Sequence, residues 1–296
     1  MNRMLQDKSL GSRLFDIVNY FLLLIIALLM LLPFVYVVAG SFTSAVELAQ
    51  KQFVIIPSNI SLDAYKYVFS TNTIFRALFV SIGITVFGTL FSMFLSCLMA
   101  YGLAQNELPG RSVLMFLVLF TMLFSGGMIP TFLVVKQMGL IDTYASQVVP
   151  VAINAFNLII LRNFFENLPP GLEESARIDG ASDWRILFSI VIPLSMPSIA
   201  TISLFYAVTY WNTYLNAILY LNESAKWPIQ VILRQIVILA SGLAADTSGM
   251  DDSYITPPEQ TVKMAVIVVA TVPILIVYPF LQKYFAKGAL LGSVKG

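Results

Sequence analysis

Residues 168–197 read LPPGLEESARIDGASDWRILFSIVIPLSMP, and this stretch decides the fold because it is charged while its surroundings are not. Only 11% of the 296 residues are charged, and apolar runs long enough to cross a membrane lie on both sides of it. Lipid cannot satisfy the backbone and the charges of such a loop. The stretch therefore has to lie at a membrane face, between two spans.

The rest of the chain is too apolar for an ordinary soluble domain, since 58% of all residues are hydrophobic. A transmembrane helix needs about 20 mostly apolar residues. Short polar loops leave little room for a separate soluble domain. We therefore expect an all-α membrane protein with a single transmembrane domain over residues 1–296. Its six predicted spans are residues 14–40, 74–103, 113–135, 144–165, 198–220 and 264–284.

The orientation follows from lysine and arginine, which are commoner in cytoplasmic loops. With the N-terminus inside, the inner face holds ten of these residues and the outer face seven. We therefore expect both termini and the 168–197 loop in the cytoplasm, and the 222–261 loop outside it. The first apolar run is too long for a signal-peptide core, and Asp7 and Asp16 flank it, so we expect a retained anchor.

Several kinds of chemistry are missing from the composition. The chain has no histidine and one cysteine, Cys97, so we expect neither a disulfide within one chain nor a metal site of the usual His/Cys type. We expect Cys97 to be a small packing residue. The net charge of +1 comes with no basic run, so we expect no nucleic-acid partner.

Polar side chains inside the predicted spans indicate helices that line an interior or a pathway, because such groups are costly in lipid. The fourth span carries Gln147, Asn154 and Asn157, and the fifth carries Tyr210 and Asn212. Aromatic residues there have a second interpretation, the belt at the membrane interface. In the third span, the stretch SGGMIP at 125–130 predicts a kink or an unwound segment, with or without a ligand.

The charged stretch itself predicts a helix, a turn and a second helix on the inner face. Prolines at 169 and 170 allow a helix start, and Glu173 and Glu174 would then complement the helix dipole in its first turn. Gly180 offers a tight turn. Pro193 and Pro197 are expected to stop the second helix before the next span. The alternative is a solvated loop whose charges merely match the dipole.

The same stretch resembles the EAA loop of binding-protein-dependent ABC importer permeases. That family pattern is Glu-Ala-Ala, three residues, Gly, nine residues, Ile, any residue and Leu-Pro. The matching residues here are Glu174-Ser175-Ala176, Gly180, Ile190 and Ile192-Pro193, with Ser175 in place of Ala and Ile192 in place of Leu. Asp179-Gly180-Ala181 also resembles the family's common Asp-Gly-Ala.

The resemblance extends over the whole chain, to MalG-like permease subunits of carbohydrate importers with the type I ABC importer fold. The FSGGMIP stretch at 124–130 is similar to the subgroup that includes the LplC and YtcP permeases, which is associated with oligosaccharides such as pectin or xylan fragments. The resemblance implies a non-catalytic transport subunit in the cell membrane of a prokaryote, in contact with lipid.

The resemblance also implies partners. These are a second permease subunit, two cytoplasmic ATPase subunits and an extracytoplasmic sugar-binding protein. The chain has no phosphate-binding Gly-x-x-x-x-Gly-Lys-Ser/Thr motif, so ATP and Mg²⁺ are expected on the partner ATPase and no cofactor on this chain. The residues expected to contact the ATPase are Glu173, Glu174, Ser175, Ala176, Asp179, Gly180 and Ala181.

Two further sites follow from this reading. Sugars need hydrogen-bonding groups and aromatic faces, so Asn154, Asn157, Tyr210 and Asn212 are expected to line the sugar path. The loop at 241–258 is expected to meet the binding protein through Asp246, Asp251 and Asp252, or else to be a connector without a partner.

Two other classes of protein are weighed against the importer. An ion-coupled secondary carrier usually has ionisable residues within its spans, and here Arg76, Arg162 and Lys263 lie at span ends. A membrane enzyme would need a metal set or a nucleophile with a base, and the sequence offers neither.

Overall fold

The computed structural model describes residues 10–51, 53–70, 72–240 and 260–292, and the structural statements below refer to these residues. Their regular structure is helical, apart from one isolated β-bridge between Thr43 and Ile60. Contacts divide the chain into two units, which are described separately. The first unit is Met1–Ser70 with Ile236–Val269, and the second unit is Thr71–Gln235 with Ala270–Gly296.

The predicted spans appear in two forms. Three helical stretches are long and apolar enough to cross a membrane alone: Gly11–Ser41, Asn72–Ala104 and Gln260–Val277. Three further candidates are pairs of helices bent at a short break: Arg111–Leu123 with Met128–Gln137, Ala145–Val151 with Ala155–Glu166, and Asp183–Leu194 with Met196–Trp211. The expectation of a helical membrane protein is confirmed, with up to six spans if each bent pair is one span.

The first unit is built mainly from α1. Its helices are α1 (Leu10–Ser41), α2 (Ala45–Gln50), α3 (Asp63–Ser70), the end of α14 (Ile229–Ala240) and the start of α15 (Gln260–Gly292). Side chains of α1 are exposed along most of the helix, as expected where the surroundings are lipid. At the end of α1, Gly40 lies directly against Met264, which packs with Leu48 and Val54 in a small core.

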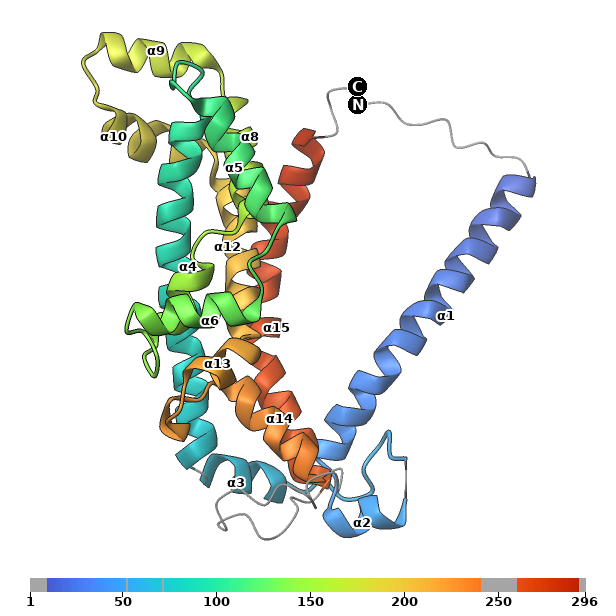
Figure 1. The fold of residues 1–296 in the computed structure, drawn as a ribbon. Coiled ribbons are helices and arrows are strands. Elements are labelled where there is room, and N and C mark those ends of the chain that lie inside the picture. Colours follow the sequence, from blue (N-terminus) through green and yellow to red (C-terminus); the bar gives the residue numbers. More distant parts are fainter. Residues whose placement is uncertain (1–9, 52, 71, 241–259, 293–296) are drawn as a thin grey trace. The chain divides into compact units, whose positions relative to one another are not determined.

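The second unit has α4 (Asn72–Ala104) at its centre, packed against α8 (Ala155–Glu166) and α12 (Met196–Trp211). Figure 1 shows α4 and α12 running side by side, with α9 and α10 at one end and α13 toward the other. The other elements of this unit are α5 (Arg111–Leu123), α6 (Met128–Gln137), α7 (Ala145–Val148), η1 (Val149–Val151), α9 (Pro170–Ile178), α10 (Asp183–Ile186), η2 (Leu187–Val191), α11 (Ile192–Leu194), α13 (Leu215–Tyr220), η3 (Ser224–Lys226), the start of α14 and the part of α15 from Ala270.

Two tyrosines on α12 join the central helices through their hydroxyl groups. The Tyr206 hydroxyl lies 2.8 Å from Oγ of Ser96, and the Tyr210 hydroxyl lies 2.6 Å from Oγ of Ser92. The Tyr206 hydroxyl also accepts a hydrogen bond of 3.0 Å from the backbone N–H of Asn154, just before α8. Buried hydroxyls need such partners because no water can replace them. These contacts therefore fix how α4, α8 and α12 pack.

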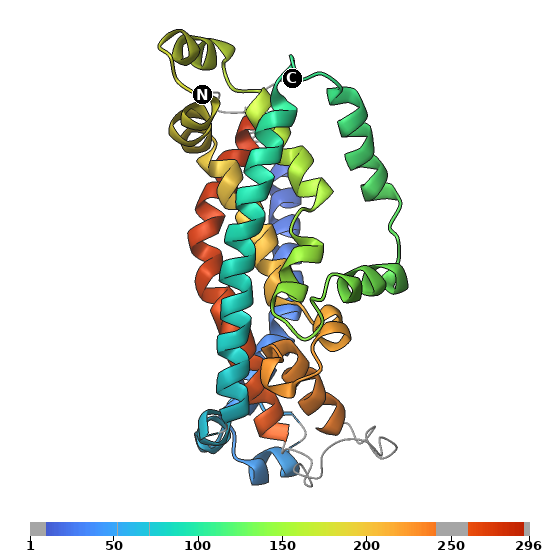
Figure 2. The ribbon, with the colours of Figure 1, turned by 60° about the vertical axis from the view of Figure 1, so that its left-hand side comes forward.

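The break between α5 and α6 is the sharpest bend of the chain's paired helices. The two helices meet at 116°, and Gly127 has a φ of 86°, a backbone conformation that favours glycine. The predicted kink at residues 125–130 is therefore confirmed. Figure 2 shows α5 and α6, in green, as an L-shaped arm that projects from the central helices of the unit.

The fifth predicted span has different bounds in the structure. Helix α12 ends at Trp211, and α13 starts only at Leu215, so the prediction of one span over 198–220 is wrong. The Asn212 side chain donates a hydrogen bond of 2.9 Å to the carbonyl of Val208, and its backbone N–H bonds the same carbonyl. An asparagine that bonds the last turn in this way favours a helix end over continued helix.

Asp142 ties the turn before α7 to the loop after α13. Its carboxylate accepts hydrogen bonds from the backbone N–H groups of Asn222 and Glu223 and forms an ion pair of 2.8 Å with Lys226. Its φ is 60°, in the left-handed region that few side chains tolerate. The hydrogen bonds from Lys226 and from the backbone hold the pKa of Asp142 below its usual value.

Gly88→Ala tests the packing of α4 against α12. A Cβ atom at position 88 would lie 2.9 Å from ring atoms of the buried Tyr210, so the ring must move at a cost of about 1–3 kcal/mol. We expect a lower midpoint of thermal unfolding in detergent. Gly83→Ala on the same helix is the matched control, because no atom lies within 4 Å of its Cβ position. Equal midpoints for the two variants would contradict the packing.

Asp142→Asn tests this connection, because asparagine tolerates the left-handed conformation and can keep one acceptor oxygen for the backbone N–H groups. The charge and the acceptor for Lys226 are lost. A lowered pKa in the folded state means that the carboxylate stabilises the protein above its unfolded pKa and ceases to do so as the pH falls through the folded value. We expect wild type to unfold at a higher temperature than the variant between about pH 5 and pH 8, and the difference to shrink as the pH falls below about pH 4. A difference that is independent of pH would contradict the role of the charge.

Candidate functional site

The charged stretch begins as a short helix whose two ends follow from its sequence. Helix α9 starts with Pro170 at its first position, where a missing N–H costs nothing. It ends in a Schellman motif, in which the Gly180 N–H bonds the Arg177 carbonyl and the Ala181 N–H bonds the Ala176 carbonyl. Gly180 has a φ of 78°, so the prediction of a tight turn at this glycine is confirmed.

The second helix of the stretch has a serine cap and contains a π-helical turn. Ser182 caps it by accepting a hydrogen bond of 3.4 Å from the Arg185 N–H, and the helical path continues through a π-helical turn to Leu194. The helix ends at Leu194, between Pro193 and Pro197, so the prediction that it stops at these prolines before the next span is confirmed. Proline lacks an N–H, and the wider turn before it avoids the need for one. The chain then bends by 86° at Ser195 into α12.

The residues expected to contact the ATPase divide into two sets. Glu173, Ala176 and Ala181 are half-buried, and the two alanines pack against the core of the second unit. The other four are exposed: Glu174, Ser175, Asp179 and Gly180. Of the two glutamates only Glu173 lies in the first turn of α9, so the placement of Glu174 there is wrong by one residue.

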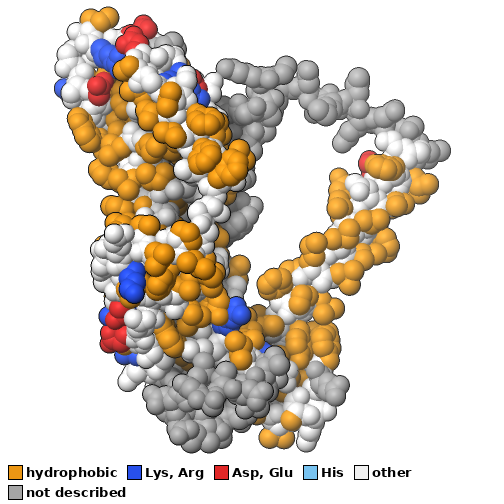
Figure 3. Space-filling view, viewed as in Figure 1, with side chains coloured by type: hydrophobic (Ala, Val, Ile, Leu, Met, Phe, Trp, Pro, Cys, Tyr) orange, Lys and Arg blue, Asp and Glu red, His pale blue; other side chains and the backbone are white. Residues whose placement is uncertain are grey.

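The outer surface of the stretch mixes charge with large apolar side chains. Figure 3 shows charged side chains gathered at the end of the second unit that carries α9 and α10, above a wide hydrophobic band. Ile178 is 86% exposed at the end of α9, and Trp184 is 60% exposed and stacks on Phe188. Exposed apolar groups rimmed by charges are typical of a surface that binds another protein.

Beneath α9, the end of α4 carries a group of polar contacts that the sequence reading missed. The side-chain amide of Gln105 donates a hydrogen bond of 3.1 Å to Glu173 and accepts one of 3.2 Å from Arg177. Glu173 and Arg177 are four residues apart on α9, so they share one face of the helix. The signal in the sequence was weak, because a single glutamine after a span has many possible roles.

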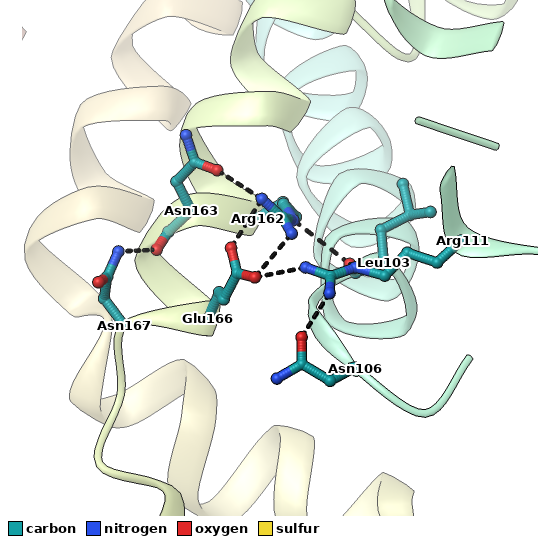
Figure 4. Close-up of polar contacts among 7 residues, drawn as sticks. All are labelled: Leu103, Asn106, Arg111, Arg162, Asn163, Glu166 and Asn167. Carbon is teal, nitrogen blue, oxygen red and sulfur yellow. Dashed lines mark hydrogen bonds and ion pairs between the residues drawn. The ribbon is translucent and has the colours of Figure 1, made fainter. Parts of the chain in front are cut away.

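A second polar cluster, the Leu103 clamp, lies next to Gln105 (Figure 4). We define it as Leu103, Asn106, Arg111, Arg162 and Glu166. Nε of Arg111 and Nε of Arg162 donate to the Leu103 carbonyl at 2.9 Å and 3.3 Å. Both arginines pair with Glu166, and Arg111 also bonds Asn106. The i,i+4 spacing of Arg162 and Glu166 was the available signal for this cluster.

The residues expected on the sugar path occupy different environments. Asn154 and Asn212 are exposed, whereas Tyr210 is 1% and Asn157 is 5% exposed. The Asn154 side chain caps α8 by accepting a hydrogen bond of 3.1 Å from the Asn157 N–H. The structure brings the backbone N–H of Asn154 within 3.0 Å of the Tyr206 hydroxyl on α12.

The remaining predicted residues fall in two groups. Asp246, Asp251, Asp252 and the loop 241–258 lie outside the described residues. Cys97 is buried in the core of the second unit, as expected for a packing residue. In the part of the chain that the structure describes, no three His, Cys, Asp or Glu side chains are grouped in a way that could hold a metal ion.

Comparisons with known proteins agree with the pattern in the charged stretch. Residues 92–290 match the family model of the binding-protein-dependent transport system inner membrane component. The polygalacturonan/rhamnogalacturonan transport system permease protein YtcP of Bacillus subtilis is 66% identical over 96% of this chain and 99% of its own length. Protein LplC of Bacillus subtilis is 55% identical over 97% of this chain and 96% of its own length.

A solved structure supports the same fold. A chain from the crystal structure of a bacterial ABC transporter that imports the acidic polysaccharide alginate is 36% identical and has a TM-score of 0.85. The match covers 94% of this chain and 98% of that chain. These likenesses rule out the ion-coupled carrier and the membrane enzyme, since permeases of this kind transport without catalysing a reaction. The chain therefore belongs to the family of binding-protein-dependent transport system inner membrane components, as a permease subunit of an ABC importer.

Proposed function

We propose that this permease carries oligosaccharides that contain uronic acids across a bacterial cell membrane. The observation that carries this proposal is the 66% identity to a polygalacturonan/rhamnogalacturonan permease over nearly the whole length of both chains. The solved relative at 36% identity imports alginate, which is also an acidic polysaccharide. Relatives named for neutral sugars, such as the arabinooligosaccharide permease AraQ of Bacillus subtilis, are 29% identical.

The proposed assembly contains this chain, a second permease, two ATPase subunits and a sugar-binding protein. The ATPases are separate chains, since this sequence has no phosphate-binding loop, and they hold ATP and Mg²⁺. A structural neighbour that is 17% identical, with a TM-score of 0.56, is an alginate transporter in complex with a periplasmic protein bound to alginate pentasaccharide. By analogy, residues 241–258 with Asp246, Asp251 and Asp252 are proposed to meet the binding protein.

In the proposed orientation both termini and the charged stretch are cytoplasmic, in line with the bias of lysine and arginine. The ATPase then meets α9 through its exposed side. Glu174, Ser175 and Asp179 are available there, and Ile178 supplies an apolar contact. The half-buried residues are proposed to hold α9 against the rest of the second unit. They are Glu173, Ala176 and Ala181.

The sugar path is proposed to use exposed polar groups of the second unit. Asn154 and Asn212 offer amide donors and acceptors, and Tyr210 and Asn157 stay in the proposal as buried neighbours that position them. A uronate carboxylate also needs a cation. The guanidinium of Arg234 lies 4.3 Å from the ring centroid of Tyr214, two residues beyond Asn212, and its side chain is exposed.

The cargo is tested with the importer reconstituted in proteoliposomes with its binding protein. We expect trigalacturonate to stimulate ATP hydrolysis and to be taken up, and arabinotriose of the same length to do neither. The reverse preference would exclude uronic-acid oligosaccharides as the cargo and leave the importer assignment intact. Binding of the same two sugars to the isolated binding protein serves as the control for delivery.

Glu174→Lys tests the proposed ATPase contact. Reversal of an exposed charge at an interface places like charges together and weakens docking by about tenfold or more. We expect normal membrane insertion and a loss of sugar uptake, measured in proteoliposomes. Asp63→Lys is the control, because it reverses an exposed charge in α3, within the loop between the first two predicted spans, which is extracytoplasmic in the proposed orientation. Unchanged uptake with Glu174→Lys would remove this residue from the contact.

A further inference from the structure

The contacts that hold α9 in place matter because the helix is too short to be stable alone. It has nine residues, and isolated helices below about 12–15 residues are marginal in water. Ala176 on this helix and Ala181 just after it pack against the core, and such small side chains bury little apolar area. Apolar packing alone therefore stabilises the position of α9 on the rest of the second unit only weakly. Directed polar contacts have to supply the rest.

Gln105 supplies such contacts with both ends of its amide. Its NH₂ group lies 3.1 Å from the Glu173 carboxylate, and its carbonyl oxygen lies 3.2 Å from the Arg177 guanidinium. A carboxylate only accepts hydrogen bonds and a guanidinium only donates them. An amide is the side chain that offers one donor and one acceptor to such a pair. Gln105 is half-buried. Its hydrogen bond to Glu173 is partly shielded from water, whereas its hydrogen bond to Arg177 is exposed.

Gln105 is itself fastened to the permease. It follows directly after the last residue of α4, and its N–H bonds the carbonyl of Gly102. Two residues before it, the Leu103 carbonyl is held by Arg111 from the start of α5 and by Arg162 from the end of α8. Glu166 pairs with both arginines, so the ends of three helices form one charged cluster (Figure 4).

We propose that Gln105 is a positioning residue that couples α9 to this cluster, so that a movement imposed on α9 shifts the ends of α4, α5 and α8 together. The proposal rests on the proposed function, in which the ATPase moves α9. It assigns a role to a residue outside the EAA loop. The contact consists of the Gln105 amide, which is hydrogen-bonded to two opposite charges one helical turn apart, Glu173 and Arg177.

The first test is Gln105→Met in the complete importer, reconstituted with its second permease, ATPase subunits and binding protein. Methionine has a similar length and makes neither hydrogen bond. Loss of both hydrogen bonds is expected to lower sugar uptake per ATP hydrolysed by about tenfold. Co-purification of the ATPase is expected to persist, since the exposed face of α9 is unchanged.

The second test exchanges the partners. Gln105→Glu places a carboxylate against Glu173, and we expect it to lower the ratio of uptake to hydrolysis. In the double variant Gln105→Glu with Glu173→Gln, the new amide at position 173 donates to the new carboxylate at position 105. That carboxylate can still accept a hydrogen bond from Arg177. We expect the double variant to recover most of the ratio, which a purely structural role of Gln105 does not predict. If Gln105→Met is not recovered from membranes, this exchange decides alone.

The control is Glu107→Gln, a change at an exposed position in the same loop, which should match wild type. The inference fails if the wild-type importer is stimulated by its loaded binding protein and Gln105→Met keeps the same ratio of uptake to hydrolysis. It also fails if the double variant is no better than Gln105→Glu. A wild-type importer that trigalacturonate-loaded binding protein does not stimulate would instead contradict the proposed function.

Discussion

A bilayer offers no water to polar groups, and the polar contacts of the second unit follow from this constraint. The hydroxyls of Tyr206 and Tyr210 reach across to Ser96 and Ser92 on α4, and Tyr206 also satisfies the N–H of Asn154 where the backbone departs from helix. The indole N–H of Trp211 likewise donates to the carbonyl of Ala270. Each of these contacts removes a buried unpaired group, and together they set how the central helices pack.

The breaks in the helices are subject to the same constraint, because each break leaves backbone N–H and C=O groups that need another hydrogen-bond partner. The break before α8 is capped by the side chain of Asn154, and the start of α14 is met by Oγ of Ser81, which accepts from the Ile229 N–H at 2.8 Å. Gly127 turns the chain between α5 and α6 without a side-chain cap. A permease has to change shape during transport. Capped breaks allow its helices to bend without leaving backbone N–H or C=O groups unpaired.

Charge in this protein is concentrated where the helices end, since a charged group there can reach water or an opposite charge. Arg111 and Arg162 donate to the Leu103 carbonyl near the end of α4, where the helix dipole is negative and favours cations, and Glu166 pairs with both arginines. Glu173 and Arg177 continue this chemistry on α9 through Gln105. The charged stretch thus has two faces, one joined to the permease by hydrogen bonds and one open to a partner.

The sequence by itself determined the helical membrane class, the helix–turn–helix order of the charged stretch, the turn at Gly180 and the kink at residues 125–130. These features depend on local composition: apolar length, a proline at a helix start and a glycine where φ is positive. The resemblance at Glu174 to Pro193 also identified the family, because its spacing is long and specific.

Only the tertiary structure decided which face of α9 is inward, that Tyr210 is buried, and that α12 ends at Trp211. It also decided that Gln105 meets residues 68 and 72 positions later in the chain. Long-range hydrogen bonds leave no local pattern, since a lone polar residue in a sequence does not indicate its partner. The packing of α4, α8 and α12 brings those partners together, and that packing depends on the whole chain.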